Sequence, residues 1–165
     1  MRLSVPHVFD IVLRARPIPV LGHLAYYTVR VAGAEVPRSV RPGRRFRLMH
    51  GGSGVVIHPN TTIGNNVTVF QGVTLGRADI YRSNESTPFE GIVLEDNVTV
   101  CAGAKVLCSS GVLRLSRGTI VGANAVLTHS TRPGEIWVGI PARLIRTREE
   151  YSEGPSRAVR GDCSE

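Results

Sequence analysis

A strict period of six residues runs through the stretch from Ile57 to Gly76, and it limits the possible folds of this chain more than any other feature. Ile57, Ile63, Val69 and Leu75 recur at this interval, and a small or β-branched residue stands four places after each of the first three. A helix repeats every 3.6 residues and a plain strand every two, so neither explains the period. Six-residue units with one buried aliphatic residue are typical of a parallel β-helix, in which each unit forms a short strand and a turn.

The same period extends in both directions, with interruptions. It begins with Val36, Pro42 and Leu48, stretches to nine residues before Ile57, stops over 77–91, and breaks again over 108–111. We expect projecting segments at these breaks, because polar, turn-rich insertions in a solenoid leave the coil at a corner. The side chains predicted to point inward are Ile57, Ile63, Val69, Leu75, Val100, Val106, Val121 and Leu127.

The flanking regions predict a simple domain organisation. Residues 1–35 carry helical spacing in two pieces, 8–14 and 21–31, separated by Pro17 and Pro19, and predict a short helical cap on the open end of the solenoid. Residues 36–146 form the predicted β-helix, with a projecting loop over 77–91. A final helix or strap is expected over 142–150. The polar tail, 147–165, is expected to be disordered.

Composition narrows the functional classes. Hydrophobic residues make up 42% of the chain but aromatic residues only 5%, which suits a narrow aliphatic core. Three cysteines without metal-ligand spacing favour reduced thiols and a cytoplasmic location. The net charge of +7 comes mainly from scattered arginines with few aromatics between them, so no nucleic-acid partner is expected. No apolar run has membrane-spanning length, so no membrane partner is expected either.

Five motifs carry a resemblance to a known family: HGGSGVVIHPNTTIGNNV, FQGVTLG, AGAKVL, VGANAVL and WVGIPARLIR. With them, residues 36–146 resemble the hexapeptide-repeat acyltransferases, and among these the serine acetyltransferase-like branch. The resemblance implies an all-β, left-handed parallel β-helix and a homotrimer with active sites between neighbouring prisms. It also implies an acetyl-CoA-dependent O-acetyltransferase that acts on L-serine or a related small acceptor, with no metal.

The resemblance assigns the general base to His50, which follows Leu48 in the first break of the repeat. An alcohol must lose its proton as it attacks the thioester carbonyl, and an imidazole, with an ordinary pKa of about 6.5, accepts that proton near neutral pH. The chain departs from the family at two places. Met49 replaces the aspartate that usually precedes this histidine, and Ser86-Thr87-Pro88 replaces the second histidine and its neighbouring arginine.

These departures leave the acceptor open. Arg77 and Arg82 in the projecting loop are candidates to bind a carboxylate of the acceptor. A sugar hydroxyl in polysaccharide or antibiotic synthesis is the alternative to serine. The tail ends in Asp162-Cys163-Ser164-Glu165 rather than the isoleucine with which serine acetyltransferases dock into cysteine synthase, so no such complex is expected.

The resemblance also places the contacts of coenzyme A. Gly76, Ala102 and Ala123 are expected beside the pantetheine arm, because only small residues let a thin chain lie close to the coil. For each of them, coil geometry alone is an equally good explanation. The candidates for the phosphates and the adenine are the basic residues Lys105, Arg143 and Arg146.

Two further histidines raise hypotheses of another class. His58 and His129, together with His50, are compatible in number with a zinc site of the kind found in carbonic-anhydrase-like relatives of the fold, although their spacing differs. A solenoid without catalysis is the third hypothesis, because Met49 removes the usual partner of the base. Cys101 and Cys108 are expected to be structural.

Overall fold

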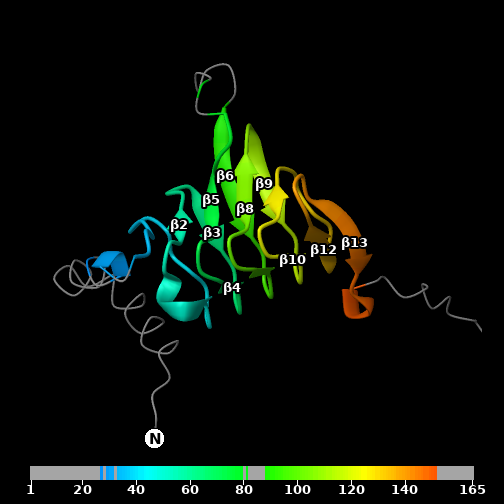
Figure 1. Cartoon of the computed structure of the whole chain (residues 1–165), viewed down its shortest axis with the longest axis horizontal. Coiled ribbons are helices and arrows are strands. Elements are labelled where there is room, and N and C mark those ends of the chain that lie inside the picture. The colour runs from blue at the N-terminus through cyan, green and yellow to red at the C-terminus, as the bar shows by residue number, and fades with distance from the viewer. Residues whose placement is uncertain (1–26, 28, 32, 80, 82–87, 152–165) are drawn as a thin grey trace, which may run out of the picture.

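The computed structural model describes residues 27, 29–31, 33–79, 81 and 88–151. Within them the chain forms thirteen short strands that stack side by side along one axis, from the first coil to a terminal strap (Figure 1). The strands are β1 (Arg47–Leu48), β2 (Val56–Ile57), β3 (Thr61–Ile63), β4 (Thr68–Val69), β5 (Thr74–Arg77), β6 (Phe89–Leu94), β7 (Thr99–Val100), β8 (Lys105–Cys108), β9 (Gly111–Leu115), β10 (Ile120–Val121), β11 (Val126–Leu127), β12 (Glu135–Val138) and β13 (Arg143–Thr147). Two 3-10 segments, η1 (Met49–Gly52) and η2 (Glu149–Tyr151), complete the described part.

The strands form three sheets that the chain visits in rotation. The six-stranded sheet has the order β1-β4-β7-β10-β12-β13, the four-stranded sheet β11-β8-β5-β2, and the three-stranded sheet β3-β6-β9. Pairing is parallel except between β12 and β13. Each of the first three turns of the solenoid therefore adds one strand to each face, which confirms the parallel β-helix predicted from the six-residue period.

The register of the sheets aligns the predicted ladder residues. Ile57 pairs with Leu75, Leu75 with Val106, and Val106 with Leu127, so one aliphatic column runs the length of the four-stranded sheet. All eight residues predicted to point inward are at most 3% exposed. The core is thus a stack of Ile, Val and Leu side chains enclosed by the three sheets, as the low aromatic content suggested.

The projecting loop is shorter than expected. β5 includes Arg77 and β6 begins at Phe89, so both ends of the predicted 77–91 segment are strand. The reason is that the next coil also lengthens: Arg77 pairs with Cys108, and Phe89 with Gly111. β6 and β9 rise above the neighbouring coils in Figure 1. Residues 80 and 82–87, the middle of the loop, lie outside the described residues.

The structure bears only in part on the expected N-terminal helical cap and C-terminal strap. Tyr27 and residues 29–31 are helical, and Val29 is 1% exposed against the core. The rest of the expected cap, including segment 8–14, lies outside the described residues. At the other end, the expected helix or strap over 142–150 is a strap: β13 runs antiparallel to β12. Ordered structure continues beyond the expected boundary at 146, to Tyr151, and residues 152–165 lie outside the description.

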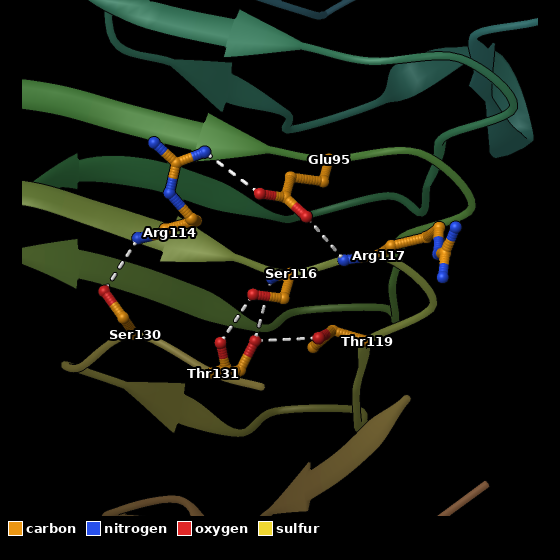
Figure 2. Close-up of polar contacts among 7 residues, drawn as sticks. All are labelled: Glu95, Arg114, Ser116, Arg117, Thr119, Ser130 and Thr131. Carbon is orange, nitrogen blue, oxygen red and sulfur yellow. Dashed lines mark hydrogen bonds and ion pairs between the residues drawn. The ribbon is translucent and has the colours of Figure 1, made fainter. Parts of the chain in front are cut away.

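Side-chain hydroxyls close the last coil, where the three-stranded sheet ends at β9. The amides of Arg114 and Ser116 donate to Ser130 Oγ (2.9 Å) and Thr131 Oγ1 (3.0 Å) (Figure 2). The Thr131 amide donates back to the Arg114 carbonyl (2.9 Å). Thr119 Oγ1 lies 2.7 Å from Thr131 Oγ1. These bonds pair the edge of β9, which would otherwise offer free backbone groups to another strand.

Candidate functional site

The first interruption of the repeat places His50 on a tight excursion between β1 and β2. Its backbone is left-handed, with φ 52° and ψ 38°, and the next two residues, Gly51 and Gly52, also have positive φ. Such a conformation costs a non-glycine residue roughly 1–3 kcal/mol and is concentrated at functional positions. The His50 side chain is exposed, and its ring centroid lies 6.3 Å from that of Phe70 in the following coil.

The excursion is the first of four corners that stack on one edge of the prism. We call residues 49–54, 70–73, 101–104 and 122–125 the corner row; each segment leaves the six-stranded sheet and enters the four-stranded sheet. Hydrogen bonds connect successive corners: Gly72 N donates to Ser53 O (2.8 Å), Gly103 N to Gln71 O (2.9 Å) and Asn124 N to Ala102 O (2.9 Å). His50 therefore stands at the head of a continuous row of backbone turns.

Glycine is required at the centre of this row. Gly54, Gly72 and Gly103 have φ of +69°, +70° and +70°, a backbone conformation that residues with side chains rarely adopt. Larger residues would be strained by this conformation. Three of the four corners therefore have a glycine at the equivalent position.

The small residues expected to contact coenzyme A divide between the row and the sheet beside it. Ala102 is half-buried and Ala123 exposed, both on the corner row. Gly76 lies in β5 of the four-stranded sheet. A Cβ on Gly76 would approach only Thr74 Cγ2, at an ordinary 3.7 Å, and its φ is not positive. Neither packing nor backbone conformation within the described chain requires a glycine there.

The basic residues expected at the phosphates lie in two elements. Lys105 begins β8, and its Nζ donates to the Gly72 carbonyl at 2.7 Å. Arg143 and Arg146 both belong to the strap β13, where Arg146 lies 3.7 Å from the exposed Glu149 carboxylate. The structure thus brings Lys105 to the corner row and leaves the two arginines on the terminal strap.

A second cluster lies where the projecting loop begins. Arg77 Nε donates to Asp79 Oδ1 at 2.7 Å, and this hydrogen bond raises the pKa of the Arg77 guanidinium. His58 Nδ1 accepts from the Asn60 amide (3.1 Å), and its ring meets Phe89 edge-on at 4.6 Å. Burial, together with the charge of Arg77, lowers the pKa of His58. Arg82, the other candidate for the acceptor, lies outside the described residues.

The three histidines do not converge. His129 packs edge-on against Trp137 at 4.7 Å in the last coil, whereas His50 and His58 lie near Phe70 and Phe89. In the described part of the chain, no group of three His, Cys, Asp or Glu residues is arranged to hold a metal ion. Burial raises the pKa of both Cys101, in the corner row, and Cys108, at the end of β8.

A separate hollow of about 360 Å³ occurs at another edge of the prism, where the three-stranded sheet turns into the six-stranded one. Its lining residues mostly bond to one another: the Asn65 backbone amide donates to Asp96 Oδ1 (2.6 Å), and Asn66 Nδ2 donates to Asn97 Oδ1 (2.7 Å). It is therefore a ladder of turn residues, and it contains no histidine. The lining residues are Arg44, Arg45, Asn65, Asn66, Asp96 and Asn97.

One contact at the site has no local signal in the sequence. Gly72, the partner of Lys105, lies 33 residues earlier in the chain and is recognised only once the coils are stacked. No hydrogen bond joins the His50 ring to a carboxylate among the described residues, consistent with Met49 in the place of the usual aspartate. The sequence did contain one overlooked signal, which is that Lys105 is its single lysine.

No family model matches the chain. It is similar to curated serine acetyltransferases, for example that of Bacillus licheniformis, with 40% identity over 113 residues, which are 68% of this chain and 48% of the relative. The chain thus spans about half the length of the curated relatives it matches. None of the described helices is long and apolar enough to cross a membrane.

Solved structures give the same result for the fold. Serine acetyltransferase of Brucella abortus strain S19, in complex with coenzyme A, is 23% identical with a TM-score of 0.66, covering 82% of this chain and 54% of that one. Soybean serine acetyltransferase, complexed with serine, is 26% identical with a TM-score of 0.63, covering 83% and 54%. Over about two thirds of its length, the chain is therefore homologous to the serine acetyltransferases and shares their hexapeptide-repeat fold.

Proposed function

We propose that the protein is an acetyl-CoA-dependent O-acetyltransferase that acetylates a hydroxyl of L-serine or of a related small acceptor. The observation that carries the proposal is the position of His50, exposed and left-handed at the head of the corner row. The homologues support it, since they are named serine acetyltransferases. Of the similar structures, that of Brucella abortus holds coenzyme A and that of soybean holds serine.

In the proposed reaction, His50 is the general base and the acetyl group passes directly to the acceptor. The imidazole takes the proton of the acceptor hydroxyl while its oxygen attacks the thioester carbonyl carbon. A backbone N–H of the corner row stabilises the oxyanion that forms. The C–S bond then breaks, and the imidazolium returns the proton to the departing thiolate. No acyl-enzyme forms, so neither Cys101 nor Cys108 carries an acetyl group.

The cofactor would lie along the corner row. Ala102 and Ala123 would line the pantetheine arm, and Gly76 would leave space for it on the four-stranded sheet. Support for Gly76 comes from its ordinary φ and open surroundings, because a glycine that the chain itself does not need often marks a close approach by a ligand. Arg143 and Arg146 would contact the phosphates and the adenine.

For the acceptor, we propose contacts from the projecting loop. Arg77 and Arg82 are the candidates for a carboxylate of the acceptor. Since Arg77 is already bonded to Asp79, a carboxylate ligand would have to share or replace that partner. The alternative acceptor is a sugar hydroxyl in polysaccharide or antibiotic synthesis. Met49 and Ser86-Thr87-Pro88 both weaken the assignment to serine. Met49 replaces the acid beside the base, and Ser86-Thr87-Pro88 replaces the groups that handle the amino acid in the family.

The proposal includes the finer architecture. Residues 36–146 would form a left-handed coil, and three copies would assemble so that the corner row of one prism faces a groove shared with its neighbour. Such an assembly would enclose His50 and exclude water from the thioester, which strengthens the electrostatic interactions in the site.

The test is release of free thiol from acetyl-CoA, measured with purified protein against a panel of hydroxy amino acids and sugars. With the acceptor that the parent uses, His50→Ala should lower turnover by roughly 10²–10⁴, the usual contribution of a positioned acid–base group. The affinity for coenzyme A should be little changed. His58→Ala is the comparison variant, and near-parental turnover in His50→Ala would refute the assignment of the base.

A further inference from the structure

Lys105 has an unusual place in both the sequence and the structure. It is the only lysine among the chain's 20 lysine and arginine residues. It begins β8 and pairs with Thr74 of β5, and its half-buried side chain reaches back over the preceding coil. There its Nζ donates a hydrogen bond of 2.7 Å to the carbonyl of Gly72, in the corner that follows β4.

Gly72 is in turn bonded to the excursion that carries His50. Its amide donates to the Ser53 carbonyl at 2.8 Å, and the Ser53 amide lies 3.5 Å from the His50 carbonyl. Gly72 is thus fixed on one side by Lys105 and on the other by Ser53. Phe70, which lies near the His50 ring, belongs to the same corner.

We propose that Lys105 is a positioning residue, whose ammonium holds the Gly72 corner and thereby the His50 excursion, and that it does not act as a ligand of the cofactor phosphates. Its effect on catalysis rests on the proposed acetyl transfer, whereas its effect on the corner does not. The His50 conformation is intrinsically unfavourable, so contacts around it must fix it.

The chemistry of the two basic side chains explains why a lysine stands here. An ammonium is compact and can direct one of its three hydrogens to a carbonyl in a confined corner, whereas a guanidinium is planar and wider. At a phosphate, the preference is opposite, because arginine binds phosphate with two parallel hydrogen bonds and replaces lysine well. The two roles therefore predict different results for Lys105→Arg.

The first measurement is amide hydrogen exchange, which needs no activity. In Lys105→Met, the amides of 50–54 and of Gly72 should exchange faster than in the parent. Val126→Met is the matched control, because Val126 pairs with Lys105 one coil further on the same sheet and should leave these amides unchanged. Parental exchange at Gly72 in Lys105→Met would overturn the proposal, whether or not the protein transfers acetyl groups.

The second measurement separates positioning from phosphate binding. Lys105→Met should lower kcat by about 10- to 100-fold, as small misplacements of a catalytic group do, with the KM for acetyl-CoA unchanged. The loss should be equal with acetyl-pantetheine, which lacks the phosphates of the cofactor, and Lys105→Arg should not restore kcat. A raised KM for acetyl-CoA alone, with rescue by arginine, would assign Lys105 to the phosphates instead. A parent without any thiol release would refute the proposed function, while the exchange result would still decide the role of Lys105 at the corner.

Discussion

His50 illustrates how one residue can be fixed by its neighbours rather than by a partner for its ring. The residue is left-handed, and three glycines follow it within four positions, Gly51, Gly52 and Gly54, all with positive φ. These glycines let the chain turn sharply, and Gly52 is buried against Ala34 and Leu48. The orientation of His50 therefore depends on backbone packing, which explains how the excursion can persist with Met49 in place of an acid.

His58 provides a prediction about pH at the same scale. Burial and the charge of Arg77 lower the pKa of His58 in the folded protein. The unfolded chain, in which this pKa takes its ordinary value of about 6.5, then binds more protons than the folded one. The contribution of His58 to the free energy of unfolding should therefore be constant well above pH 6.5 and become unfavourable as the pH falls below it.

The test compares thermal unfolding of the parent and of His58→Gln between pH 5 and pH 8, since glutamine forms hydrogen bonds but does not titrate. The difference in melting temperature should be independent of pH near pH 8 and should shift in favour of His58→Gln on acidification. Parallel curves across the whole range would show that His58 does not contribute in this way.

Among the elements, the strap β13 and the segment η2 close the end of the prism. Tyr151 of η2 lies against Gly118 and Gly134, where a side chain in place of either glycine would collide with the ring. The guanidinium carbons of Arg117 and Arg148 lie 5.6 Å and 5.0 Å from the ring centroid. The ring thus connects the strap to the corner before β10.

Removing this ring should loosen the C-terminal end. Each cation–π contact contributes about 0.5–1 kcal/mol, so Tyr151→Ala should lower the free energy of unfolding by about 1–2 kcal/mol in urea titrations. Tyr151→Phe keeps the ring and should stay close to the parent. If the two variants were equally stable, the ring would not anchor the strap.

At the scale of elements, the sequence predicts the stacking of the coils but not every contact between them. The column of Ile57, Leu75 and Val106 was predictable, because a period of six is a local property and each residue repeats the same environment. The bond of Lys105 with Gly72 was not, since it joins residues 33 apart on neighbouring coils. The position of His50 came from the resemblance, which assigned Lys105 to the cofactor phosphates and not to the Gly72 carbonyl.

At the scale of the whole molecule, the three sheets enclose one narrow core of mainly aliphatic side chains, so an unpaired charge at an inward position would disrupt the fold. The outward face is tolerant: β3 alternates buried Thr61, exposed Thr62 and buried Ile63. Adjacent residues on one short strand therefore differ sharply in whether they tolerate a charged side chain. The proposed trimer requires a folded prism, so a change that unfolds the prism also abolishes the trimer.

This alternation gives a matched pair of variants. Ile63→Asp would bury an unpaired carboxylate among aliphatic side chains. Its cost, about several kcal/mol or more, is comparable to the whole free energy of unfolding of a typical domain. Thr62→Asp places the same group one residue away, in solvent, and should remain folded. In sedimentation equilibrium, the parent and Thr62→Asp should show three times the chain mass of 17.8 kDa, whereas Ile63→Asp should be insoluble or unfolded. A folded Ile63→Asp would contradict the inward register, and a monomeric parent would contradict the trimer while leaving the register intact.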